Sequence, residues 1–104
     1  MESGYLSTVH NIYEPWDPVL KEWSARNKIP LQTRYREEEV RSFTLVGPDG
    51  SRVCQIWLEL DPLQVKAWDL KERSQTFEAE TSLESALDQA LETARAWIDP
   101  QSTA

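Results

Sequence analysis

The chain has little of the chemistry from which most enzyme sites are built. Its single cysteine, Cys54, excludes an internal disulfide framework and favours a reducing cytoplasm. Its single histidine, His10, has no partner at the spacing of a catalytic triad or a metal pair. The three glycines form no phosphate-binding cluster. We therefore expect a protein that is not an enzyme and that has no cofactor and no metal site.

Long apolar runs and basic clusters are missing as well. Residues 1–11 lack the basic start and apolar centre of a signal peptide, and no segment approaches membrane-spanning length. Lysine and arginine number 11 against 18 acidic residues, which gives a net charge of −7. Because phosphate binding draws on clustered basic side chains, the composition disfavours nucleic-acid and membrane partners. A protein partner, or a second copy of the chain, remains the expectation.

The residues that are present suit one small domain. The chain has 104 residues, of which 39% are hydrophobic, and five are tryptophans. This length and hydrophobic content are enough for a single core without stabilising disulfides or metal ions, and no linker divides the sequence. We expect one domain over residues 1–104, with a loosely ordered segment at 1–15 and a short tail at 99–104.

The segment from Thr81 to Ile98 has the clearest pattern in the chain. Its apolar residues recur at the three-and-four spacing of one helix face. Thr81 and Glu84 match a T-x-x-E capping box, and Pro100 follows where a helix cannot continue. The apolar stripe consists of Leu83, Ala86, Leu87, Ala90, Leu91, Ala94, Trp97 and Ile98. Such a helix needs a hydrophobic partner, so the rest of the chain must supply one.

The preceding sequence predicts a first helix and then strands. Asp17 as the N-cap and Pro18 at the first helical position indicate a helix start, with a helix over residues 18–26. From residue 31 the period changes to two, with strand patterns at 31–36, 40–46, 52–60 and 65–70 and a short fifth at 75–79. We therefore predict an α+β two-layer sandwich, in which a meander of three to five antiparallel strands carries both helices on one face.

This order of elements is similar to that of double-stranded RNA-binding domains, as topology alone. That family grips phosphates with a basic motif at the start of its last helix. Here Thr81, Glu84 and Asp88 take the place of that motif. RNA binding is therefore disfavoured.

The turns predict which residues share a face of the sheet. A turn at 47–50 would pair Val46 with Ser51, and a turn at 61–64 would pair Leu60 with Val65. Both registers give one apolar face, which we expect to be the core beneath the helices. It holds Phe43, Leu45, Cys54, Ile56, Leu58, Leu60, Val65 and Ala67. In that setting Cys54 is an inert, buried thiol.

The opposite face is mostly polar, yet Val40, Trp57 and Trp68 line up across it. A tight turn at residues 71–74 would add Phe77 beside Trp68. Apolar strips of this kind tend to mark interfaces, and tryptophan often dominates binding energy. We therefore predict a small non-catalytic interaction module that uses this face, most simply to form a homodimer. Two plainer interpretations are that the N-terminal segment covers the strip, or that the aromatic residues only stabilise the sheet.

A second candidate surface is an acidic ridge on the last helix. Glu84, Asp88 and Glu92 follow each other at four-residue spacing. An acidic inhibitor or immunity-type protein would use such a ridge to mask a basic partner, although an ordinary solvated face explains the pattern too. A small enzyme or ligand carrier with a pocket between helices and sheet is the third hypothesis.

Overall fold

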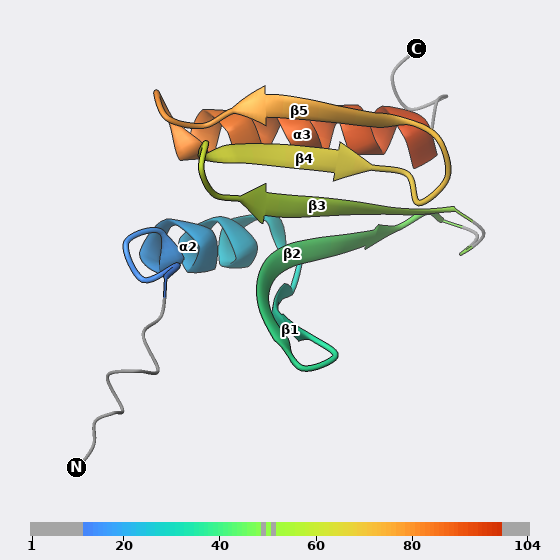
Figure 1. The fold of residues 1–104 in the computed structure, drawn as a ribbon. Coiled ribbons are helices and arrows are strands. Elements are labelled where there is room, and N and C mark those ends of the chain that lie inside the picture. Colours follow the sequence, from blue (N-terminus) through green and yellow to red (C-terminus); the bar gives the residue numbers. More distant parts are fainter. Residues whose placement is uncertain (1–11, 49, 51, 99–104) are drawn as a thin grey trace.

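The computed structural model describes residues 12–48, 50 and 52–98. Helix α2 spans Asp17–Asn27 and helix α3 spans Leu83–Ile98, with five strands between them. The strands are β1 (Leu31–Tyr35), β2 (Glu38–Val46), β3 (Val53–Glu59), β4 (Gln64–Trp68) and β5 (Ser74–Glu78). They form one antiparallel meander in the order β1-β2-β3-β4-β5 (Figure 1), which confirms the α+β fold. The tail at 99–104, most of the segment at 1–15, and His10 lie outside the described residues.

Helix α3 covers one face of the sheet through its apolar stripe. It packs against β3, β4 and β5, and Figure 1 shows it running behind β4 and β5. Its buried residues are Leu83, Ala86, Leu87, Ala90, Leu91 and Ala94. The stripe was predicted correctly because its spacing matches the helical repeat over four turns.

The start of α3 differs from the predicted capping box. The cap is Ser82, whose hydroxyl oxygen accepts the backbone N–H of Ser85 at 3.1 Å. The backbone N–H of Thr81 donates instead to the Glu78 carboxylate at 2.6 Å, and Glu84 pairs with Arg26. The prediction that Thr81 and Glu84 cap each other is wrong, because serine one position later satisfies the first turn equally well.

Helix α2 packs beside α3 on the same side of the sheet. Leu20 and Trp23 are buried, and the Trp23 ring lies edge-on to Phe43 with centroids 4.8 Å apart. Asp17 was expected to cap the helix, but its carboxylate instead accepts hydrogen bonds from Arg41, which is only 3% exposed. The first helix is therefore tied to β2 by a buried ion pair.

The predicted core face is confirmed, although the predicted strand pairs are not. Phe43 pairs with Ile56, and Leu45 pairs with Cys54. The loop extends to Arg52, whose carbonyl accepts the N–H of Gly47 at 2.8 Å, so the register shifts by two residues. A shift of two leaves every side chain on its original face. The same holds between β3 and β4, where Val65 pairs with Leu58 rather than with Leu60.

Phe77 lies on the core side, so its expected place beside Trp68 is wrong. The loop between β4 and β5 spans residues 69–73 rather than 71–74, and Phe77 pairs with Val65. The Asp69 carboxylate closes this loop by accepting the backbone N–H groups of Lys71 at 2.9 Å and Arg73 at 3.0 Å. The register therefore shifts by three, and an odd shift moves the whole strand to the other face. Phe77 packs against the hydrophobic core.

The closure of this loop should survive mild acid. Burial favours a higher pKa for Asp69, but the hydrogen bonds from the Arg73 side chain and from the two backbone amides outweigh it, so the pKa lies below the ordinary 3.8. Because the folded state has the lower pKa, the carboxylate stabilises the loop above about pH 4, and this stabilisation is lost as pH falls through the folded pKa. We expect the amide shifts of Lys71 and Arg73 to titrate with a midpoint below 3.8 in an NMR pH series. The Asp69→Asn variant should lack this transition, and a midpoint at or above the ordinary value would contradict the assignment.

Candidate functional site

The sheet face turned away from α2 and α3, called the outer face here, is built from two cross-strand rows. Each row takes one residue from each of β2, β3, β4 and β5. The first row is Ser42, Trp57, Lys66 and Thr76, and the second is Thr44, Gln55, Trp68 and Ser74. Within the described residues both helices pack on the opposite side of the sheet, and Figure 1 shows β4 and β5 in front of α3.

Trp57 and Trp68 lie on this face as diagonal neighbours. Trp57 pairs with Ser42 and Lys66, whereas Trp68 pairs with Gln55. The prediction that the two indoles lie directly opposite each other is wrong, because the register between β3 and β4 is shifted by two residues. Side chains at diagonal positions nevertheless remain within reach of each other. Both indoles are half-buried.

Val40 and Tyr35 extend the apolar part of the outer face toward β1. Val40 is half-buried and lies two residues before Ser42, so it does not face Trp57 directly. The Tyr35 ring meets the Trp57 ring edge-on, with centroids 6.2 Å apart and an interplanar angle of 79°. Tyr35 is 51% exposed, so its ring adds accessible aromatic surface beside Trp57.

The position of Tyr35 on the outer face was not predicted, and the reason is local. The pairing of β1 with β2 is irregular between Gln32 and Arg34, so the simple alternation of β1 does not carry through to its end. A bulge of this kind re-aims the side chains that follow it. The only clue in the sequence was an aromatic residue just before a turn without glycine. Such a residue can lie on either face of a sheet.

Polar side chains of the outer face are hydrogen-bonded to one another. The Trp57 indole N–H donates to Gln55 Oε1 at 2.8 Å, and the Thr44 hydroxyl donates to Gln32 Oε1 at 2.8 Å. At the other end of β3, Gln64 donates to Glu59 at 2.6 Å. Because these donors already have partners, covering the face with another apolar surface would not leave them unsatisfied.

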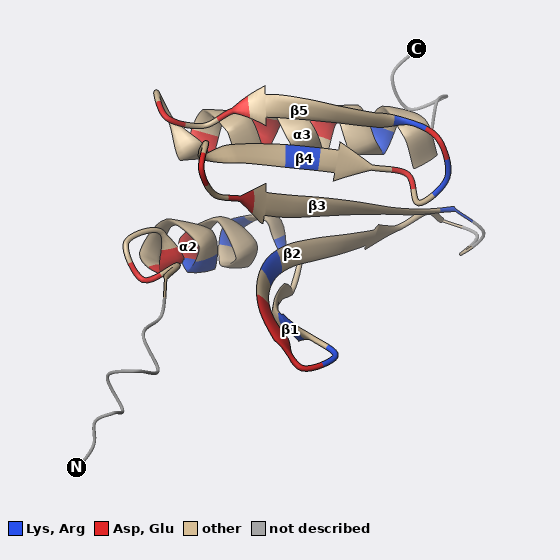
Figure 2. Ribbon diagram, in the orientation of Figure 1, with Lys and Arg blue, Asp and Glu red and all other residues tan. Residues whose placement is uncertain are grey.

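The outer face also carries little charge for a protein with a net charge of −7. Lys66 is the one ionisable side chain among the eight residues of the two rows. Figure 2 shows the middle of β3, β4 and β5 in tan apart from the Lys66 segment of β4, while acidic segments gather at the strand ends and on α3. Electrostatic repulsion between two copies would therefore be small at the middle of this face.

The acidic ridge on α3 is partly used inside the molecule. Glu84 forms an ion pair with Arg26 at 2.5 Å, with both side chains about half exposed. Asp88 accepts the indole N–H of buried Trp23 at 2.9 Å. Glu92 is exposed. Two of the three carboxylates thus hold α2 against α3, and the use of the ridge for a partner stays a prediction.

These contacts separate the three carboxylates by their effect on stability. Asp88→Ala should lower the free energy of unfolding by about 1–2 kcal/mol, because it leaves the buried Trp23 donor without its acceptor. Glu92→Ala, an exposed change on the same ridge, should stay within about 0.5 kcal/mol of the parent protein. Urea unfolding measures both. Equal effects of the two substitutions would contradict the structural role of Asp88.

Cys54 occupies the buried position that the sequence predicts. Its side chain is 1% exposed, and its Sγ lies 3.8 Å from the carbonyl oxygen of Ala94. Burial raises the pKa of the Cys54 thiol, and the nearby Asp69 charge adds to this effect. The thiol is therefore protonated and poorly nucleophilic at neutral pH.

Within residues 12–48, 50 and 52–98, neither a cluster of three or more metal-ligating side chains nor a helix long and apolar enough to span a membrane occurs. Comparison of the chain with models of known protein families, with curated proteins and with solved structures finds no match.

Proposed function

We propose that this protein is a small, non-catalytic interaction module that binds a second copy of itself through the outer face. The observation that carries the proposal is the pair of half-buried indoles, Trp57 and Trp68, on a sheet face to which the described helices do not pack. Tryptophan in such a setting supplies a large area of apolar contact at low conformational cost.

A second copy is the partner that fits the charge distribution best. A basic partner would be drawn to the acidic ends and helices, whereas the charge-poor outer face suits another charge-poor surface. A twofold axis makes such an interface self-complementary, and two sheets stack face to face with a separation of about 10 Å. Residues from both copies would then cover the indoles.

The size of the face sets the expected strength. Five strands about 4.8 Å apart and roughly 20 Å long outline roughly 500 Å². Standard interfaces take about 800 Å² of accessible surface from each partner, so the face supports an interface smaller than the standard size. We therefore expect a reversible dimer with an affinity in the micromolar range. The cytoplasm is the setting we propose, since its reducing conditions suit a lone thiol.

Sedimentation equilibrium from low micromolar to millimolar concentration tests the proposal. The average mass should rise from the 12.1 kDa of one chain toward twice that value. The rise should be nearly insensitive to salt, because the interface contains few charges. A mass of one chain throughout the range would exclude the homodimer.

A further inference from the structure

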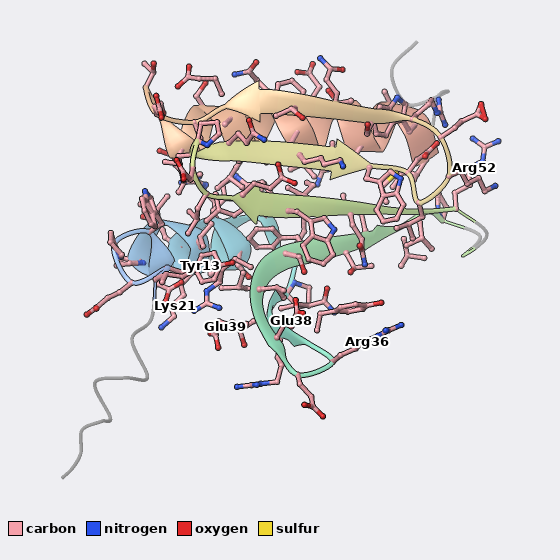
Figure 3. All side chains as sticks on the ribbon, viewed as in Figure 1. Tyr13, Lys21, Arg36, Glu38, Glu39 and Arg52 are labelled. Carbon is pink, nitrogen blue, oxygen red and sulfur yellow. The ribbon has the colours of Figure 1, made fainter. Side chains whose placement is uncertain are left out.

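A pocket of about 570 Å³ lies at one end of the sheet, away from the centre of the outer face. It is bounded by the start of β3, the 69–73 loop and the last turn of α3. Figure 3 labels Arg52 at this end of the molecule, and Figure 1 shows the β4–β5 loop and the end of α3 beside it. Its volume falls within the range of about 300–1,000 Å³ that is typical of small-molecule sites.

The charge of this pocket is opposite to that of the whole protein. Its lining includes three cations, Arg52, Lys71 and Arg73, and one carboxylate, Asp69, which gives a local charge of +2 against −7 for the chain. Asp69 is already occupied, since it accepts two backbone N–H groups and the Arg73 Nε–H. The single carboxylate therefore closes its own loop and does not neutralise Arg52 and Lys71.

Internal contacts position both arginines before any ligand arrives. Arg52 donates to the carbonyl oxygen of Trp97 at 3.3 Å, where it also satisfies the end of α3. Arg73 donates to Asp69 at 2.9 Å, and its guanidinium lies 5.2 Å from the centroid of the Trp97 ring. Lys71 is exposed. Cations held in this way lose little entropy on binding, and each guanidinium has more donors than these contacts use.

The rest of the pocket is apolar. Val53, Cys54, Leu70, Trp97 and Ile98 complete its lining. Leu70 is 38% exposed, although the backbone N–H groups of Asp69 and Lys71 on either side of it are both hydrogen-bonded within the loop. Apolar walls beside converging cations suit a molecule that has one charged group and one hydrophobic group.

We infer that this pocket binds a small organic anion, with a carboxylate or phosphate group held by Arg52, Lys71 and Arg73 and an apolar group against Leu70 and Trp97. The site is separate from the outer face, so it adds to the proposed self-association and does not depend on it. Charge-assisted hydrogen bonds from guanidinium to carboxylate or phosphate would supply the specificity.

NMR titration of the full chain with defined probes tests the inference. Benzoate and phenyl phosphate should each produce saturable amide shifts at Arg52, Leu70 and Lys71, and the stronger of the two identifies the preferred anion. Benzylamine, which has the opposite charge, should produce none. Inorganic phosphate, which lacks the apolar group, should bind more weakly than phenyl phosphate.

Charge-removing variants provide the matched comparison. Lys71→Gln and Arg52→Gln should each weaken binding about tenfold or more, the effect of losing one charge-assisted contact. Lys21→Gln removes the same charge from an exposed site on α2, at the other end of the molecule in Figure 3, and should leave binding unchanged. The inference is overturned if neither anion gives saturable shifts. It is also overturned if Lys71→Gln and Arg52→Gln, with melting temperatures near that of the parent, bind as tightly as the parent.

Discussion

Replacing Trp57 with alanine should weaken self-association by at least about 30-fold, since truncating one central tryptophan of an interface commonly costs about 2 kcal/mol of binding energy and a twofold dimer loses two. Trp57 is the residue in contact with Tyr35 and bonded to Gln55, so its loss removes the centre of the apolar strip. The double substitution Trp57→Ala and Trp68→Ala should abolish association at micromolar concentration. Sedimentation equilibrium measures both.

The same variants should remain folded. Both indoles lie outside the buried core cluster. Each substitution should therefore lower the free energy of unfolding by less than the loss of about 3–5 kcal/mol that is typical of truncating a core tryptophan. Leu70→Ala, which removes an exposed apolar side chain from the 69–73 loop, is the control and should dimerise like the parent. Variants that dimerise normally would contradict the proposal. A collapse of the melting temperature would instead show that the strip stabilises the fold.

The buried ion pair between α2 and β2 should contribute strongly to the stability of the fold. Asp17→Asn should lower the free energy of unfolding by about 3 kcal/mol, because it leaves a buried cation without its main partner. The Arg41 side chain is 4% exposed, and its Nε lies 2.7 Å from Asp17 Oδ1. The hydrogen bond with Asp17 is the largest influence that raises the pKa of Arg41, so the guanidinium stays charged. Urea unfolding gives the cost directly.

Two variants control for this effect. Glu39→Gln removes the other carboxylate that contacts Arg41 at 2.7 Å, but that side chain is 45% exposed, so the cost should stay below about 1 kcal/mol. Arg41→Met combined with Asp17→Asn should recover much of the loss, since no uncompensated charge then remains. A single Asp17→Asn variant as stable as the parent would show that the pair does not anchor α2.

The faces of β2, β3 and β4 were predictable, but the face of β5 and the registers were not. Alternation assigned Phe43, Cys54 and Ile56 correctly because burial selects side chains two residues apart. The loops decide which residues pair, and the hydrogen bonds that close each loop form only in the folded structure. One example is the Asp69 carboxylate, which closes the five-residue loop at 69–73. That closure moved Phe77 to the core side, while the two even shifts left Trp57 and Trp68 in place.

The remaining features could not be predicted from the sequence for a similar reason. Tyr35 reaches Trp57 only because the β1–β2 pairing is irregular. The pocket assembles Arg52, the 69–73 loop and Trp97 from three segments that no spacing rule links. The contacts of Glu84 and Asp88 with α2 likewise depend on how the two helices lie together. Each of these is a tertiary contact between elements distant in the sequence.

Self-association through the outer face can be tested directly by a dilution series followed by amide chemical shifts. Between millimolar and low micromolar concentration, the largest changes should fall on Gln55, Trp57, Lys66 and Trp68, with little change along the exposed side of α3. This result would place the second copy on the outer face. Shifts confined to Glu84, Asp88 and Glu92, or no concentration dependence at all, would contradict it.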